Sequence, residues 1–297
     1  MRPISVIFLI FTLTNSFCYY DITAERKFRF ANKYAGFHSF PYFVRKFPNM
    51  PKSFDWRENA YLSSVKNQHL PTYCGSCWAF ASTSTIADRI YIAKNLSHFD
   101  HFSLSVQVVI ACAQSGDCKL GGFASGVYEY ALKEGIPDDT CSPYLAHDTE
   151  CLPKIRCSTC TEMQSCFVIK EYQKYFIKDY SYLSGEDNII NEMFARGPLS
   201  CSMYASENFV FNYTGGVYVE NSNSLPNHLV SILGWGEDVD EHDKVRPYWI
   251  IRNSWGTNWG EKGFFRIPRS SYKDGRYTLN IEKGLYFSNY RGCVNSF

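Results

Sequence analysis

Dense clusters of one charge and long apolar runs are both scarce in this sequence. Its 30 Lys and Arg residues are balanced by 29 Asp and Glu residues, which leaves a net charge of +1. Without a basic block the chain lacks the electrostatic footprint of nucleic-acid binding, so we expect no nucleic-acid partner. The notable apolar run covers residues 4–13, whereas a bilayer requires roughly 20 residues. We therefore expect no integral membrane segment.

Internal repeats and low-complexity tracts are also absent, which excludes repeat architectures and compositionally disordered chains. What is present is typical of a globular protein, with 45% hydrophobic and 17% aromatic residues. A chain of 297 residues can bury a sizeable core in one or two domains.

The N-terminal residues have the pattern of a secretory signal peptide. Arg2 precedes the apolar run, and the small residues Thr14 and Ser16 follow it, which predicts a signal over residues 1–16. A buried N-terminal element is the alternative. Residues 17–49 are aromatic and basic without a helical or strand period, which indicates an extended segment lying on another surface, with a processing site near Met50.

Twelve cysteines behind a signal peptide predict disulfide bonds. Four of them are close enough in sequence to suggest zinc as an alternative: Cys151, Cys157, Cys160 and Cys166. Oxidation competes with zinc in the secretory pathway and no histidine pair lies alongside, so we expect no metal. Asn95 and Asn212 each begin an Asn-X-Ser/Thr triplet and are candidate N-glycosylation sites.

Helical signals dominate the middle of the chain. After Cys77, apolar residues recur at spacings that define one helix face: Ala79, Ile86, Ile90 and Ala93. Residues 105–111 and 126–133 predict two further short helices.

Strand signals dominate from about residue 168, where Tyr, Val, Ile and Gly occur in short runs. Helices followed by strands predict an α+β fold in two lobes, about 51–167 mainly helical and about 168–297 mainly β. An active-site cleft would lie between the lobes.

The stretch NQHLPTYCGSCWAF, residues 67–80, carries the chemistry. It places Gln68, His69 and Cys77 on a short loop that leads into the first helix. A cysteine at a helix start faces unpaired N–H groups and the positive end of the helix dipole, which favours the nucleophilic thiolate. The alternative is that Cys74 and Cys77 form a redox or half-zinc C-x-x-C pair, although the βαβ context of a redox motif is missing.

A cysteine nucleophile needs a base, and the base needs an orienting group. His228 begins the apolar run HLVSILGWG, and Asn253 ends the run PYWIIRN. An antiparallel hairpin centred near residues 240 and 241 would make these two residues cross-strand neighbours within hydrogen-bonding reach. Taken alone, His228 is more typical of an ordinary strand residue, and Asn253 is more typical of a turn residue.

With these residues in view, the chain resembles the papain-like cysteine peptidases. CGSCWAF resembles the nucleophile signature of that family, HLVSILGWG its histidine block and YWIIRNSWGTNWGEKGFFRI its asparagine block. The three blocks occur in order within residues 51–297. The resemblance implies a two-lobed fold with a helical left lobe and a β-barrel-like right lobe.

The resemblance also implies roles for the matching residues. Cys77 attacks the substrate carbonyl as a thiolate paired with His228, which then protonates the leaving amine. Asn253 holds the His228 ring, and Trp255 shields that hydrogen bond. Gln68 and the Cys77 backbone N–H form the oxyanion hole. No cofactor is implied.

Three residues are inserted between Gln68 and Cys77 relative to typical members. The insertion His69-Leu-Pro resembles the mini-loop of the cathepsin Z subfamily, also called cathepsin X. The resemblance implies a carboxypeptidase in which His69, helped by Tyr73, holds the free C-terminal carboxylate of a peptide or protein. An ordinary histidine titrates near 6.5, so we expect this anchor to be strongest in acid.

The subfamily resemblance implies a short propeptide, residues 17–50, and a zymogen disulfide between Cys18 and Cys77. If the signal is cleaved after Cys18, Cys77 stays reduced. The resemblance pairs the other ten cysteines as Cys74–Cys118, Cys112–Cys151, Cys141–Cys157, Cys160–Cys166 and Cys201–Cys293.

Three alternatives to the carboxypeptidase remain: an endopeptidase, an enzyme that trims from the N-terminus, and a catalytically silent binding protein on the same fold. The chain keeps both Cys77 and His228, which favours an enzyme. We expect a monomer that is secreted or resides in a lysosome or another acidic endomembrane compartment.

Overall fold

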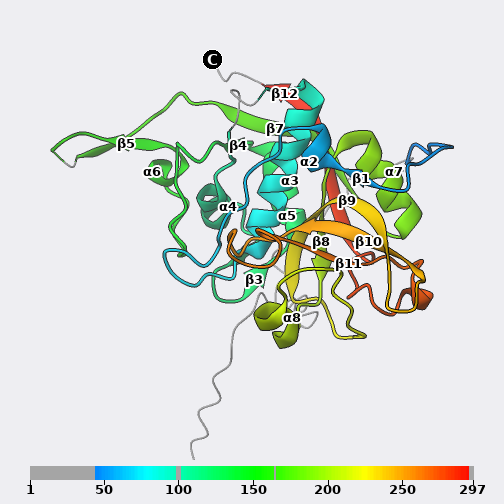
Figure 1. The fold of residues 1–297 in the computed structure, drawn as a ribbon. Helices are drawn as coiled ribbons and strands as arrows, with labels where there is room; N and C mark the ends of the chain where they lie inside the picture. The colour runs from blue at the N-terminus through cyan, green and yellow to red at the C-terminus, as the bar shows by residue number, and fades with distance from the viewer. Residues whose placement is uncertain (1–43, 98–101, 164, 294–297) are drawn as a thin grey trace, which may run out of the picture.

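The computed structural model describes residues 44–97, 102–163 and 165–293 (Figure 1). The expected signal peptide, Cys18 and most of the expected propeptide lie outside these residues. Within the described part, no helix is long and apolar enough to cross a membrane.

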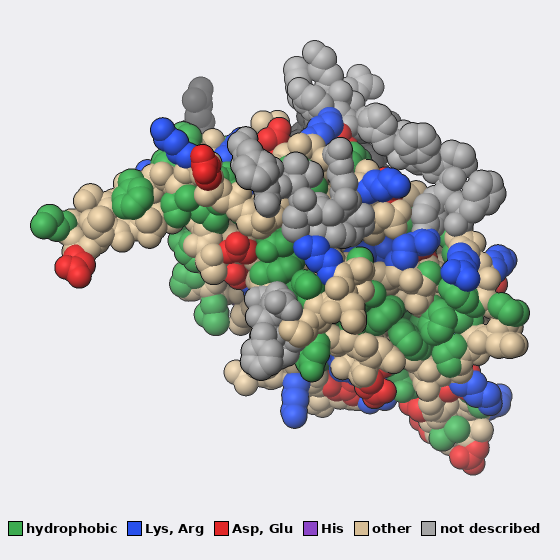
Figure 2. All heavy atoms as spheres, turned by 90° about the horizontal axis from the view of Figure 1, so that it is seen from above, with side chains coloured by type: hydrophobic (Ala, Val, Ile, Leu, Met, Phe, Trp, Pro, Cys, Tyr) green, Lys and Arg blue, Asp and Glu red, His purple; other side chains and the backbone are tan. Residues whose placement is uncertain are grey.

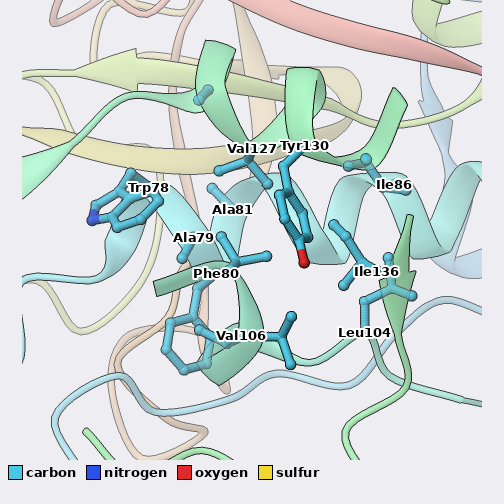
Figure 3. Close-up of a cluster of buried hydrophobic side chains, with 14 of the residues drawn as sticks. Trp78, Ala79, Phe80, Ala81, Ile86, Leu104, Val106, Val127, Tyr130 and Ile136 are labelled. Atoms are coloured by element: carbon cyan, nitrogen blue, oxygen red, sulfur yellow. The ribbon is translucent and has the colours of Figure 1, made fainter. Parts of the chain in front are cut away.

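Helices surround one hydrophobic core in the first half of the described chain. The three predicted helices are confirmed as α3 (Cys77–Lys94), α4 (Val106–Cys112) and α5 (Ala124–Lys133). Trp78 and Ile86 of α3 lie in this core with Val127 of α5 and Ile136 (Figure 3). The shorter elements of this half are α2 (Trp56–Asn59), β2 (Gly116–Asp117), β3 (Gly121–Gly122), β4 (Ile136–Pro137), α6 (Pro153–Arg156), β5 (Ser158–Cys160) and β6 (Cys166–Val168).

Helix α3 is buried over most of its surface rather than along one face. It packs against α4 and α5 and also against strands β9 (His228–Val239) and β12 (Leu285–Cys293). The buried surface differs from the single apolar face predicted from the sequence. Trp78 and Thr85, which lie outside that face, are buried, while Ala93, which belongs to it, is exposed. A helix enclosed on both sides is held at a fixed position, and so is the residue at its start.

A single antiparallel sheet forms most of the second half. Its strand order is β11-β10-β9-β8-β12-β7-β4, and β1 (Phe54–Asp55) pairs separately with β9. In the described part of the chain this sheet has two ends, β11 and β4, so the barrel-like lobe expected above is an open sheet and not a closed barrel. The remaining elements are β7 (Lys174–Leu183), α7 (Glu186–Arg196), β8 (Leu199–Met203), α8 (Glu207–Asn212), β10 (Val245–Arg252), β11 (Phe264–Pro268) and the 3-10 turn η3 (Lys273–Gly275).

The hairpin of β9 and β10 forms as predicted but in a different register. Trp249 pairs with Trp235, and after a bulge between Ile250 and Ile251 the residue Arg252 pairs with Ser231. Continuing this register places Asn253 opposite position 230, two residues from His228. The pair is therefore diagonal rather than directly opposite, and diagonal neighbours lie on the same sheet face.

The arm formed by β5 and β6 projects from the helical half (Figure 1). Hydrophobic side chains lie on its surface (Figure 2), among them Met163, which is 91% exposed, and Phe167, which is 54% exposed. The Cys160–Cys166 disulfide joins its two strands.

Three more disulfides staple the helical half: Cys74–Cys118, Cys112–Cys151 and Cys141–Cys157. These and the bridge of the arm are four of the pairs that the family resemblance implies. All four cysteines considered for zinc lie in these bridges. Their sulfurs are therefore not thiolates that could bind the metal.

The expected Cys201–Cys293 pair is wrong. Cys201 is a free, buried thiol whose Sγ donates to the Val230 carbonyl at 3.6 Å. Leu285 pairs with Cys201 across β12 and β8, whereas Cys293 pairs with Tyr175 on β7. Eight residues of strand separate Leu285 from Cys293, roughly 25 Å, whereas a disulfide needs Cα atoms about 4–7 Å apart.

Two buried ion pairs join α3 to the second half of the chain, one to strand β10 and one to helix α7. The Asp88 carboxylate accepts a hydrogen bond from Arg252 at 2.6 Å and two more from the backbone and hydroxyl of Ser63. The next residue, Arg89, contacts the Glu192 carboxylate of α7 at 3.0 Å. These charges are enclosed yet extensively hydrogen-bonded, which is the condition under which a buried pair is tolerated.

We expect Asp88→Ala to lower the free energy of unfolding by about 3–5 kcal/mol, because it leaves the Arg252 guanidinium buried without its counter-charge. Adding Arg252→Met should recover part of the loss. Urea unfolding with the disulfides intact measures both. Lys133→Ala is the matched control, since the Lys133 side chain is 51% exposed in its pair with Glu129 and its loss should cost about 1 kcal/mol or less. A single Asp88 variant as stable as the Lys133 variant would contradict the expectation.

Candidate active site

His228 and Asn253 are brought together at the open end of the β9–β10 hairpin. The His228 Nε2 atom lies 2.8 Å from the Asn253 Oδ1 atom, and both residues are 3% exposed. Asn253 Oδ1 also accepts the backbone N–H of Ser254 at 2.8 Å. This identifies it as the acceptor, so Nε2 carries the proton. In the neutral ring Nδ1 is then the basic nitrogen.

Trp255 covers this pair. Its ring stacks on the His228 ring with 4.6 Å between centroids and an interplanar angle of 26°. The aromatic side chains of Phe209 and Trp259 pack against Trp255 in turn. Exclusion of water strengthens the hydrogen bond between His228 and Asn253, because the local dielectric is low.

Cys77 is the first residue of α3 and is fully buried. It belongs to the same apolar cluster as Leu229, the neighbour of His228, since α3 packs on β9. Ser76 occupies the N-cap position without making a side-chain cap. Cys77 is disulfide-bonded. The expected partner, Cys18, lies outside the described residues.

Gln68 lies between the two halves of the molecule. From the β half, Ser254 binds it twice: its carbonyl accepts the Gln68 N–H at 2.8 Å, and its hydroxyl donates to Gln68 Oε1 at 2.6 Å. From the helical half, the Cys74 carbonyl accepts a hydrogen bond from Gln68 Nε2 at 3.1 Å. These bonds fix the orientation of the amide and direct its N–H side toward the loop that leads to Cys77.

The ring of His69, the first inserted residue, stacks on the ring of Tyr73, which lies two residues beyond the insertion. Their ring centroids are 4.7 Å apart and nearly parallel. The Asn67 side chain accepts the His69 backbone N–H at 2.9 Å, which turns the chain at this point. The His69 Nδ1 atom is buried and has no hydrogen-bond partner among the described residues. Leu70, which follows His69 in the sequence, is 61% exposed.

Burial lowers the pKa of both histidines to about 4. For His228 the hydrogen bond to Asn253 acts in the opposite direction, while the nearby His69 lowers the pKa further. The value near 6.5 expected for His69 is therefore wrong for this structure, because desolvation disfavours the charged ring. Burial also raises the pKa of Tyr73.

A small cavity lies behind Asn253, between α3 and the β9–β10 hairpin. Its volume is about 30 Å³, and its lining includes Phe80, Ser84, Ser231 and Arg252. That volume suits one or two water molecules and excludes a peptide.

The chain belongs to the papain family of cysteine proteases, whose family model matches residues 50–286. It is 46% identical over 248 residues to cathepsin Z of Onchocerca volvulus, a match that covers 82% of this chain and 79% of that protein. It is 35% identical over 223 residues to fruit bromelain of Ananas comosus, a match that covers 74% of this chain and 55% of that longer protein.

Solved structures show the same fold. A mite-allergen structure from a comparison of Blo t 1 with Der p 1 matches with a TM-score of 0.67 and 27% identity, over 83% of this chain and 73% of that one. Bromelain from Ananas comosus in complex with the E64 inhibitor matches with a TM-score of 0.63 and 29% identity, over 81% of this chain and 100% of that one.

Sequence reasoning missed two residues that contact Gln68. Ser254 directly follows Asn253 in the sequence, and this position next to a candidate site residue is the signal that could have identified it. Tyr144 donates its hydroxyl hydrogen to the Gln68 carbonyl at 2.7 Å, although 76 residues separate them. No local pattern marks Tyr144, because its contact depends on how the loop between Cys141 and Cys151 folds back.

We expect the free energy of unfolding to fall as the pH decreases from about 6.5 to about 4. Above this window neither state is protonated at His69 or His228. Within it the unfolded chain binds a proton at each ring while the folded ring, with its pKa near 4, stays neutral. His69→Gln should show a smaller fall than the wild type, whereas a change at the exposed His242, His242→Gln, should leave the fall unchanged. Urea unfolding at pH 7 and pH 4.5 measures the difference, and equal falls in all three proteins would refute the assignment.

Proposed function

We propose that this papain-family peptidase is a carboxypeptidase that removes single residues from the C-terminus of peptides and proteins. The observation that carries the proposal is the inserted loop beside Gln68. It presents the half-buried imidazole of His69, which stacks on the Tyr73 ring and whose enclosed Nδ1 atom has no hydrogen-bond partner among the described residues. A ring nitrogen without a partner in a partly enclosed site is suited to receive a substrate carboxylate.

The proposed reaction has two steps. The Cys77 thiolate attacks the last peptide carbonyl, and His228 transfers its proton to the leaving amino acid, which leaves a thioester on Cys77. His228 then removes a proton from water, and the resulting hydroxide releases the shortened peptide and restores the thiolate. The Gln68 amide and the Cys77 N–H stabilise the oxyanion in both steps. Asn253 keeps the His228 ring in the orientation that the hydrogen bond fixes.

The two charge states of His228 follow from its surroundings. In the structure Cys77 is disulfide-bonded and the pKa of His228 is about 4, so the ring is neutral. A thiolate at Cys77 would supply a nearby negative charge, which favours the imidazolium. Reduction of the disulfide by an external thiol would release Cys77 as the thiolate nucleophile, and His228 would take up a proton from solvent to become the acid.

Recognition of a carboxylate by His69 should involve uptake of a proton. In the free enzyme burial keeps this ring neutral above pH 4. A carboxylate bound against Nδ1 would offset the desolvation and stabilise the charged ring, which is the stronger donor. Binding of a free C-terminus should thus strengthen as the pH falls toward 4.

The organisation of the precursor is part of the proposal: signal peptide 1–16, propeptide 17–50 with a Cys18–Cys77 disulfide, and mature enzyme 51–297. The family match begins at residue 50, which supports that boundary. Asn95 and Asn212 are exposed, which supports glycosylation at both. We propose an acidic endomembrane compartment such as the lysosome, or secretion, as its location, and a monomer as its form.

The test is digestion of a defined peptide by the activated enzyme, followed over time by mass spectrometry. We expect a ladder that loses one C-terminal residue at a time, and no products from Cys77→Ser. Internal fragments would instead indicate an endopeptidase, and a ladder from the other end an enzyme that trims the N-terminus. If a thiol-directed inhibitor labels Cys77 but nothing is cleaved, the protein is a silent binding protein.

His69→Ala should lower kcat/KM for a peptide with a free C-terminus and leave the amidated form of the same peptide almost unaffected. A charge-assisted hydrogen bond is worth about 1.5–3 kcal/mol, so we expect a loss of roughly 10- to 100-fold, larger at pH 5 than at pH 7. The exposed neighbour provides the control, Leu70→Ala, which should retain the preference for the free acid. An unchanged ratio between the two peptides in His69→Ala would exclude His69 as the anchor.

A further inference from the structure

We propose that Tyr144 is a positioning residue for the oxyanion hole, an inference that rests on the function proposed for Gln68 and Cys77. Tyr144 lies outside the residues that carry the chemistry. Its hydroxyl nevertheless contacts the loop that carries Gln68 and Cys77 at two points, the carbonyl of Gln68 and the side chain of Ser76. Each of these two contacts measures 2.7 Å between oxygen atoms.

The direction of the two hydrogen bonds follows from counting protons. Tyr144 has one hydroxyl hydrogen, and it is donated to the Gln68 carbonyl. The Ser76 hydroxyl must therefore donate to the Tyr144 oxygen. The result is a chain from Ser76 to Tyr144 to Gln68 in which each bond polarises the next. Burial raises the pKa of Tyr144 to about 12, so the hydroxyl keeps its proton at any pH at which the enzyme works.

Ser76 contributes more to this chain than to its own helix. A serine at an N-cap normally accepts a backbone N–H of the first turn, but the Ser76 side chain makes no such cap for α3. Its hydroxyl is 2.7 Å from the Tyr144 hydroxyl instead, and Ser76 is fully buried. Ser76 directly precedes Cys77, whose backbone N–H is the second proposed oxyanion donor. The hydrogen-bond chain through Tyr144 therefore fixes the distance between the Gln68 backbone and Cys77.

The loop that carries Tyr144 is itself rigidly held. Cys141 and Cys151 at its ends are bridged to Cys157 and Cys112. Within the loop, the Leu145 N–H donates to the Gln107 side chain at 3.0 Å. A loop fixed at both ends and in the middle can hold one hydroxyl at a defined position, which a catalytic site requires.

Tyr144 and Ser254 hold Gln68 from opposite halves of the molecule. Ser254 follows the last strand residue of the β9–β10 hairpin, and Tyr144 belongs to the helical half. Gln68 is thereby aligned with respect to both His228 and Cys77, which lie on different halves. A competing explanation is that Tyr144 only fills space, since its ring packs edge-on against Phe80 at 4.8 Å. Replacement by phenylalanine separates the two roles, because it keeps the ring and removes the hydroxyl.

The experiment compares hydrolysis with alkylation in the activated enzyme. Tyr144→Phe should lower kcat about tenfold, with little change in KM, because a misaligned donor weakens binding of the transition state. The rate at which iodoacetamide alkylates Cys77 should stay within about twofold of the wild type, since that reaction forms no oxyanion. Tyr272→Phe is the matched control: it removes a buried tyrosine hydroxyl that donates to Asp240, at the far end of the hairpin, and should leave both rates unchanged.

Gln68→Ala, made in the same series, distinguishes failure of this inference from failure of the proposed function. It should reduce kcat roughly 100- to 1,000-fold, and adding Tyr144→Phe should then cause no further loss, because both changes act on one group. Equal slowing of alkylation and hydrolysis in Tyr144→Phe, or multiplicative losses in the double variant, would overturn the positioning role. An unaltered Gln68→Ala enzyme would overturn the oxyanion assignment itself. If Tyr144→Phe does not fold, Ser76→Ala breaks the same hydrogen-bond chain and should give the same split between kcat and alkylation.

Discussion

The buried pair of Asp88 and Arg252 is the contact on which the rest of the site depends. Asp88 lies in the helix that begins at Cys77, and Arg252 immediately precedes Asn253. One ion pair thus links the helix that begins at Cys77 to the strand that leads to Asn253. Both charges lie in a low dielectric, where an unpaired partner is costly, so the two halves resist independent movement. The active site is built across an interface, and this contact keeps the interface in one arrangement.

The low dielectric of the interior also sets the charge states of the two histidines. His228 and His69 are both neutral in the structure because burial disfavours their charged forms. A neutral pair suits a molecule whose Cys77 sulfur is bonded, since no anion is present to stabilise a cation. The same enclosure will strengthen the attraction between a thiolate and an imidazolium once the sulfur is released. Burial therefore favours neutral histidines while the Cys77 sulfur is bonded, and it would favour the proposed ion pair when that sulfur is free.

Local patterns in the sequence were sufficient to predict the three helices, the hairpin and the contact between His228 and Asn253. They were insufficient wherever position depends on three-dimensional register. The bulge at Ile250 moves Asn253 to a diagonal position relative to His228, and a bulge leaves no signal in an apolar run. The family resemblance implied a bridge between Cys201 and Cys293, although β12 carries Cys293 along β7 and away from Cys201. Tyr144 went unnoticed because a long-range contact made by one hydroxyl has no period.

The bulge in the hairpin has a consequence for how this region can vary. Pairing of Trp249 with Trp235 and the bulge that follows set the register at the catalytic end, while residues 240–244 form the tip at the other end. Residues 241–244 of the tip are exposed, whereas Asp240 is buried and accepts a hydrogen bond from the Tyr272 hydroxyl. Insertions within residues 241–244 would therefore extend into solvent, whereas a change at Asp240 would disturb a buried contact, and neither lies at the end of the hairpin that carries His228 and Asn253.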